Sequence, residues 1–209
     1  MDAIYPGYGF LAENSSFAEK CNQSGFKFVG PNSQVIEIMG DKIKAKELIE
    51  SLGVPVVPGY TGDIKDRDHI EGIVEGIGYP VIVKASAGGG GKGMRVVQSK
   101  EELWDSVVSA QNEAEFAFGN GEVFIEKYLQ KPRHIEVQVF GDGKGKVVHL
   151  FSRDCSLQRR YQKILEEAPA RNLPEDKLNK VQEICVSACS KLKYKGAGTL
   201  EFLYENNEF

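Results

Sequence analysis

A run of four glycines between two short apolar stretches constrains this chain more than any other feature. Residues 88–91 are all glycine, and they stand between residues 81–83 and 95–97, which predict two antiparallel strands. Glycine adopts positive φ and lets a backbone N–H approach an anion closely, so such a loop can fold over a polyphosphate. Lys84 and Lys92 add positive charge at its two ends. We therefore expect a phosphate-binding hairpin rather than a flexible linker.

The composition is typical of a globular protein and argues against several classes. A chain of 209 residues that is 41% hydrophobic is long enough to bury a sizeable core. Its net charge of −4 argues against a general nucleic-acid binder. No apolar stretch approaches the roughly 20 residues of a membrane-spanning helix, and the first residues lack a signal-peptide pattern. We expect a cytoplasmic protein with no membrane contact. Its four cysteines match no metal-site spacing, and we expect them to be reduced.

The hydrophobic periodicity divides the chain into four parts. Residues 1–40 predict the end of an open α/β domain, and residues 41–55 predict a connecting helix and a proline-containing hinge. Residues 56–128 predict a lid of two helices, the glycine hairpin and a further strand, and residues 129–209 predict the first part of a larger body. Because the first strand is short and the last hairpin is incomplete, we expect a piece of a longer protein.

Several charged residues have two interpretations at this stage. Residues 133–140 alternate between apolar and polar, which places His134 on a polar face that lies toward either solvent or a cleft. Arg159, Arg160 and Lys163 suit either a solvated face or a site for a small oxyanion. Glu201 lies on an otherwise apolar strand, so it requires a cation, either a basic side chain or Mg²⁺.

Eight stretches of the chain, taken in order, resemble the motifs of the biotin carboxylases, a branch of the ATP-grasp enzymes. The glycine loop does not fit a Walker A motif, because its Gly-Lys-Gly leads into a strand. The resemblance implies an α/β (α+β) ATP-grasp fold with a glycine-rich lid subdomain, preceded by the end of a Rossmann-like N-terminal domain. The matching stretches are PGYGFLAEN, GDK, VPVVPGYTG, KASAGGGGKGMRVV, EKYLQKPRHIEVQVFGD, RDCSLQRRYQK, EEAPA and GAGTLEFLYE.

The resemblance also implies roles for individual residues. Lys163 matches a catalytic lysine that binds bicarbonate, and Glu201 matches a Mg²⁺ ligand. Tyr161 and Tyr5 stand where the family usually has histidine. The residues implied in ATP binding are Lys42, Lys84, Gly90, Gly91, Met94, Glu126, Lys127, Tyr128, Leu129, His134, Gln158, Tyr161 and Glu201.

The implied activity is ATP- and bicarbonate-dependent carboxylation of biotin through carboxyphosphate. It requires ATP, Mg²⁺ or Mn²⁺, and biotin on a carboxyl carrier protein or domain, and a carboxyltransferase then uses the product. The resemblance implies a homo-oligomeric parent whose remaining catalytic residues lie beyond residue 209, so we expect this polypeptide to be inactive alone. The alternatives are another ATP-grasp ligase, such as urea carboxylase or carbamoyl phosphate synthetase, or a non-catalytic nucleotide-binding module.

Overall fold

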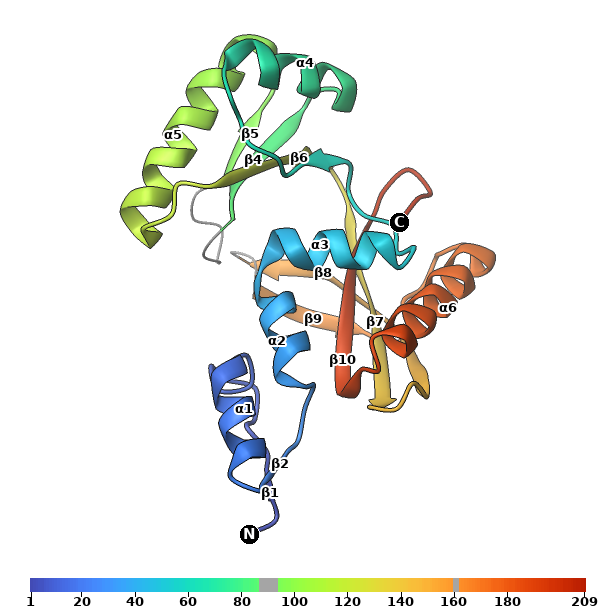
Figure 1. The fold of residues 1–209 in the computed structure, drawn as a ribbon. Coiled ribbons are helices and arrows are strands. Elements are labelled where there is room, and N and C mark those ends of the chain that lie inside the picture. The colour runs from blue at the N-terminus through green and yellow to red at the C-terminus, as the bar shows by residue number, and fades with distance from the viewer. Residues whose placement is uncertain (87–93, 160–161) are drawn as a thin grey trace. The chain divides into compact units, whose positions relative to one another are not determined.

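The computed structural model describes residues 1–86, 94–159 and 162–209 (Figure 1). Residues of the glycine loop that the sequence singles out, including Gly90 and Gly91, lie outside the described residues, as does Tyr161. The chain forms two compact units. The first consists of Met1–Pro55, Arg133–Gln158 and Lys163–Phe209, and the second consists mainly of Val56–Pro132.

The N-terminal part of the first unit is a small parallel strand pair. Strand β1 (Ala3–Ile4) pairs with β2 (Lys27–Phe28), and helix α1 (Ser15–Gln23) connects them. The helix begins after Asn14, whose side chain accepts a hydrogen bond from the Phe17 N–H at 2.7 Å. Helix α2 (Ser33–Gly40) follows and adds Ile36 to the same core. This arrangement of strand, helix and parallel strand agrees with the predicted end of a Rossmann-like domain.

Helix α3 (Lys42–Ser51) connects this part to the larger core of the first unit. Asp41 precedes it and accepts hydrogen bonds from the N–H groups of Ile43 and Lys44, both at 3.1 Å. Near its C-terminal end, Ile49 packs against the apolar core formed by the main sheet of this unit. The structure therefore places Lys42 in the first turn of a helix, as the sequence predicted.

The main sheet of the first unit has four strands in the order β10–β7–β8–β9. They are β7 (Arg133–Asp142), β8 (Val147–Arg159), β9 (Gln162–Glu167) and β10 (Lys195–Tyr204), and β7 runs antiparallel to both β8 and β10. Helix α6 (Glu175–Lys191) packs against β7 (Figure 1). The buried core between them consists of Val54, Val137, Val139, Val147, Val181, Cys185, Ala188, Cys189 and Phe202.

The cysteines of α6 belong to this core. Burial raises the pKa of Cys185 to about 12 and that of Cys189 to about 11. Both therefore stay neutral thiols near neutral pH. The prediction that these residues pack in the core is confirmed.

Residues 153–167 are the part of the sheet that the sequence did not predict. The structure extends β8 to Arg159 and adds β9 as a separate edge strand. Every residue of β9 is exposed. An edge strand that buries neither face carries no alternation of apolar and polar residues, and this alternation is the signal that identifies strands in a sequence.

The second unit has four strands in the order β3–β6–β4–β5, with two helices. The strands are β3 (Gly59–Tyr60), β4 (Val81–Ala85), β5 (Met94–Val97) and β6 (Val123–Lys127). Val81 lies opposite Val97, so the predicted antiparallel pairing around the glycine loop is confirmed. Helices α4 (Arg67–Ile77) and α5 (Lys100–Phe118) pack on the face formed by alternate strand residues (Figure 1). Their common core includes Ile70, Val74, Val81, Val83, Leu103, Val107, Val123 and Ile125.

Within the described part of the chain, no helix combines the length and the apolar character that a bilayer crossing requires.

Candidate active site

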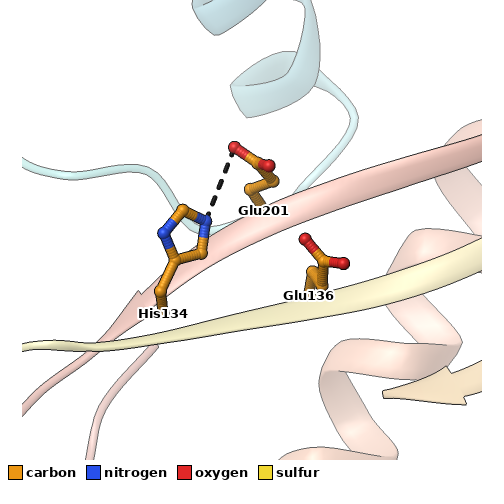
Figure 2. A group of neighbouring side chains, drawn as sticks. All are labelled: His134, Glu136 and Glu201. Atoms are coloured by element: carbon orange, nitrogen blue, oxygen red, sulfur yellow. Dashed lines mark ion pairs between the residues drawn. The ribbon is translucent and has the colours of Figure 1, made fainter. Parts of the chain in front are cut away.

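Two carboxylates lie directly opposite each other in the main sheet of the first unit. Glu136 on β7 is the register partner of Glu201 on β10 (Figure 2). Like charges that face each other across neighbouring strands destabilise a sheet unless a cation lies between them. Glu136 is completely buried, whereas the side chain of Glu201 is 52% exposed.

Lys163 supplies that cation from the edge strand β9. Its Nζ lies 2.5 Å from Oε2 of Glu136 and 2.5 Å from Oε1 of Glu201. One ammonium group therefore neutralises part of both carboxylates. The lysine implied in bicarbonate binding and the glutamate implied in metal binding are thus in direct contact.

A second cation holds the buried carboxylate from the other side. Arg153 on β8 is a register partner of Glu136, and its guanidinium contacts Oε1 of that residue. The same guanidinium donates to Oε1 of Gln138 at 3.2 Å and lies 3.6 Å from Oε2 of Glu166. Below, the "charged cluster" means Glu136, Arg153, Lys163 and Glu201. Because a buried charge requires close partners, this arrangement explains how Glu136 remains inside the sheet.

The contacts within the charged cluster keep its members ionised. The hydrogen bond from His134, with further help from Lys163, lowers the pKa of Glu201 to about 2. Burial alone would raise the pKa of Glu136, but Lys163 and Arg153 outweigh it and the net shift is downward. Burial alone would lower the pKa of Lys163, but its two carboxylate partners raise it above its usual value. The charged cluster therefore carries two anions and two cations near neutral pH.

Cys155 lies against the charged cluster. It is fully buried, and burial together with the neighbouring Glu136 carboxylate raises the pKa of its thiol to about 11. A neutral buried thiol is a poor nucleophile, so the predicted structural role of Cys155 agrees with its environment.

His134 and Gln158 extend the site beside Glu201. Nε2 of Gln158 lies 2.8 Å from Nδ1 of His134, and Nε2 of His134 lies 3.5 Å from Oε2 of Glu201. The backbone N–H of His134 donates to Oγ of Ser156 at 2.9 Å. Asp154 accepts from the side chains of both Ser156 and Arg133, which anchors this end of the sheet.

The donor set fits a hard divalent cation in part. Ligand atoms of His134, Glu136 and Glu201 all lie within 4.8 Å of one another (Figure 2). Mg²⁺ prefers carboxylate, phosphate and water oxygens over imidazole nitrogen. Glu136 is held by two cations, so the half-exposed Glu201 is the member of the set that suits Mg²⁺ best.

The second unit contains its own charged pair, on the sheet face away from α4 and α5. Nζ of Lys84 on β4 lies 2.6 Å from Oε2 of Glu126 on β6, and it also lies 6.0 Å from the ring centre of Phe124. Met94, on β5, is the register partner of Lys84. The structure therefore gathers three of the residues implied in ATP binding on one face of this sheet.

The last residue of β6 and the residue after it form hydrogen bonds within the second unit. The Lys127 N–H donates to the Pro58 carbonyl at 2.8 Å, and the Tyr128 N–H donates to the Pro80 carbonyl at 3.0 Å. Nζ of Lys127 donates to the carbonyls of Gly78 and Tyr79 at 2.9 and 2.8 Å. These contacts give Lys127 a structural role. They also leave fewer polar groups of this segment available to a ligand.

The structure thus places the predicted residues in two groups, one in each unit. His134, Gln158, Lys163 and Glu201 lie together in the first unit, and Lys84, Met94 and Glu126 lie together in the second. Lys42 belongs to the first unit, at the start of α3, and Leu129 follows β6 in the second. Sequence reasoning missed Glu136 and Arg153 as site residues. In the sequence, Glu136 is one of three polar residues on an alternating strand, with His134 and Gln138, and no local signal separates it from them.

Family comparisons agree with this site. The family model for the carbamoyl-phosphate synthase L chain, ATP binding domain, matches residues 41–209. The model for the biotin carboxylase N-terminal domain matches residues 1–36.

Individual relatives match along the whole chain. Biotin carboxylase from Pseudomonas aeruginosa is 54% identical over 208 residues, which are 99% of this chain and 46% of that protein. Pyruvate carboxylase from Bacillus subtilis is 49% identical over 100% of this chain and 18% of its own length. The biotin carboxylase domain dimer of 2-oxoglutarate carboxylase from Hydrogenobacter thermophilus, solved with MgADP, ADP and bicarbonate, matches with a TM-score of 0.89 and 48% identity. That match covers 100% of this chain and 46% of the solved one.

The fold is that of the ATP-grasp proteins, as the sequence predicted. Within that class, the chain belongs to the biotin carboxylase family. It spans about half the length of the curated biotin carboxylase that it matches, at 46%. The match to a biotin carboxylase N-terminal domain favours this family over the other ATP-grasp ligases and over a purely nucleotide-binding module.

Proposed function

We propose that this chain is the nucleotide- and bicarbonate-binding part of a biotin carboxylase. The complete enzyme uses ATP and bicarbonate to carboxylate biotin held on a carrier protein or domain, and a carboxyltransferase then passes the carboxyl group to an acceptor. The observation that carries this proposal is the contact of Lys163 with both Glu136 and Glu201. A lysine held between two carboxylates, in a family whose solved relative was crystallised with MgADP and bicarbonate, suits binding of a small oxyanion beside a metal–nucleotide complex.

The residues have separate roles in this proposal. Lys84 binds ATP phosphates, together with Lys42 and the glycine loop that contains Gly90 and Gly91. Met94, Glu126 and Leu129 contact the adenosine part, with the remaining groups of Lys127 and Tyr128. For Tyr161 the family resemblance implies a further contact with the nucleotide. Lys163 orients bicarbonate, while Glu136, which is itself held by Arg153, holds the ammonium of Lys163 in place. Glu201 binds Mg²⁺ or Mn²⁺, which when bound neutralises phosphate charge during phosphoryl transfer.

The proposed domains follow one another along the chain. Residues 1–40 end the N-terminal domain, residues 41–55 form the connection, residues 56–128 form the lid, and residues 129–209 begin the ATP-grasp body. A lid that closes over the nucleotide excludes water from the reactive carboxyphosphate. We place the enzyme in the cytoplasm, which agrees with four buried free cysteines, and expect a homo-oligomer.

Activity of the full-length polypeptide that contains this chain tests the proposal. We expect ADP formation that requires bicarbonate and increases with free biotin. Lys163→Arg keeps a cation between the carboxylates but replaces a compact ammonium with a wider planar group, so kcat should fall about 100-fold through misplacement of bicarbonate. Lys180→Arg, at an exposed position of α6, is the matched control and should leave kcat unchanged. ATP turnover that is independent of bicarbonate, or unaffected by Lys163→Arg, would contradict the proposal.

A further inference from the structure

The side-chain amide of Gln158 has two partners of different kinds. Its Nε2 lies 3.0 Å from the backbone carbonyl oxygen of Cys155 and 2.8 Å from Nδ1 of His134. Gln158 is half-buried, and it belongs to the same unit as both partners. One amide nitrogen carries two hydrogens, so it can donate to both partners at once.

The carbonyl of Cys155 determines which way this amide faces. A backbone carbonyl oxygen only accepts hydrogen bonds. If the amide of Gln158 were turned over, its own oxygen would meet the Cys155 oxygen at about the same short distance, and two acceptors would repel each other. The NH₂ group of Gln158 must therefore face both Cys155 and His134. Nδ1 of His134 then has to accept a hydrogen bond, which means that it carries no proton.

We propose that Gln158 is a positioning residue that fixes His134 as the tautomer with its proton on Nε2. Nε2, which carries that proton, lies 3.5 Å from Oε2 of Glu201 (Figure 2). His134 then presents a hydrogen-bond donor, rather than an acceptor, to the Glu201 carboxylate. Gln158 acts through the imidazole of His134, in addition to any contact of its own with a nucleotide.

The tautomer decides what His134 can do in the three-residue group with Glu136 and Glu201. A protonated Nε2 has no lone pair for a cation, so His134 is excluded as a metal ligand even though its ring lies within 4.8 Å of both carboxylates. A carboxylate that binds a metal is commonly oriented by a hydrogen-bond donor behind it. The assignment of Glu201 as a metal ligand rests on the proposed function, whereas the tautomer of His134 does not.

Nuclear magnetic resonance of the chain without nucleotide tests the tautomer directly. Long-range ¹H–¹⁵N correlation spectra distinguish a protonated ring nitrogen from an unprotonated one. The chain contains three histidines, so a His134→Gln variant assigns the signals of His134 by their loss. Spectra are recorded at about pH 8.5, where an imidazole of ordinary pKa is neutral. We expect an unprotonated Nδ1 and a protonated Nε2.

Variants of Gln158 give the causal test. Gln158→Glu replaces the donor with an acceptor, so Nδ1 should become protonated. Gln158→Leu removes the donor without adding a charge, so both neutral tautomers should appear. Gln34→Glu adds the same charge at an exposed position of α2 and should leave the His134 spectrum unchanged. Circular dichroism spectra of all variants should match that of the wild type.

The outcomes separate this proposal from the proposed function. A protonated Nδ1 in the wild type, or a His134 spectrum that Gln158→Glu and Gln158→Leu leave unchanged, would overturn the positioning role. Because these spectra require neither ATP nor bicarbonate, a failure of the activity assay would leave the result intact. Conversely, if the spectra showed the other tautomer, the measurement of bicarbonate-dependent turnover would still be a valid test of the proposed function.

Discussion

Each unit holds a carboxylate in a four-stranded sheet, but the two carboxylates have different surroundings. Each contains a four-stranded sheet with helices on one face and charged residues on the other. In the second unit, Nζ of Lys84 and Oε2 of Glu126 form an ion pair on that face at 2.6 Å. In the first unit the buried Glu136 is held by both Lys163 and Arg153, and Lys163 also reaches Glu201.

The two carboxylates differ in their burial and in the charges that face them. Glu126 keeps 12% of its side chain exposed and lies beside Lys84. Glu136 has no exposed side chain and faces a second carboxylate across the strand pair, so it requires two cations. Removing one partner from a buried charge leaves it desolvated and unpaired, whereas a partly exposed charge regains water. Substitutions in the first unit should therefore cost more stability than matched substitutions in the second.

The largest effect is expected from Lys163→Met. This change removes the cation that both Glu136 and Glu201 share, and the two carboxylates are left facing each other. The free energy of unfolding of the first unit should fall by about 3 kcal/mol, as for a broken buried ion pair. Hydrogen exchange of peptides from β7 and β10, followed by mass spectrometry, reports this unit separately.

The exposed Lys180→Met variant controls for the loss of a positive charge alone and should change exchange very little. A double variant, Lys163→Met with Glu136→Leu, should recover part of the loss, because an apolar replacement removes the buried charge as well. Equal protection of β7 in the wild type and in Lys163→Met would show that the charged cluster does not hold the sheet together.

The sequence predicted the parts of this comparison that depend on local periodicity. A short apolar run identified β4, alternating residues identified β7 and its buried face, and helical spacing identified α5 and α6. The lysine pattern around the glycine loop and the requirement of Glu201 for a cation were also visible. These features depend on residues a few positions apart, where a period of two or of 3.6 residues is enough.

The identity of the partners was not visible in the sequence. Lys163 meets Glu201 across a sequence separation of 38 residues and meets Glu136 across 27. Both contacts require β9, whose sequence carries no alternation of buried and exposed residues. Glu136 looked like any polar residue on an alternating strand, and only the pairing with β8 and β10 shows that it is buried. The pairing of strands that are distant in the sequence, and not the composition, therefore determines which residues form the charged cluster.

The second prediction concerns Lys84→Met in the other sheet. The change leaves Glu126 without its 2.6 Å partner, but part of this carboxylate can regain water. We expect the free energy of unfolding of the second unit to fall by about 1.5 kcal/mol, which is the lower end for a hydrogen bond to a charged group.

Trp104 provides the measurement for this unit. It is the one tryptophan of the chain, and it packs against the core of the second unit, so its fluorescence during urea unfolding reports that unit. Arg67→Met removes a half-exposed arginine of α4 from the buried Glu71, which keeps Lys100 as a cationic partner at 3.3 Å, so this change should cost less. A loss for Lys84→Met as large as that for Lys163→Met would contradict the link between the burial of a carboxylate and the cost of removing its cation.

The smallest expected effect is the acid dependence that Glu201 contributes. Its pKa is lowered from 4.5 to about 2, so its charged form stabilises the fold above about pH 4.5 and this contribution is lost as the pH falls toward 2. Because the side chain is 52% exposed, solvent screening reduces the contribution to less than about 1 kcal/mol. Glu201→Gln should therefore lower the free energy of unfolding at about pH 6 and change it little at about pH 2.5. Urea unfolding of both proteins across this range measures the difference, and a difference that does not vary with pH would mean that the carboxylate of Glu201 gains nothing from His134 and Lys163.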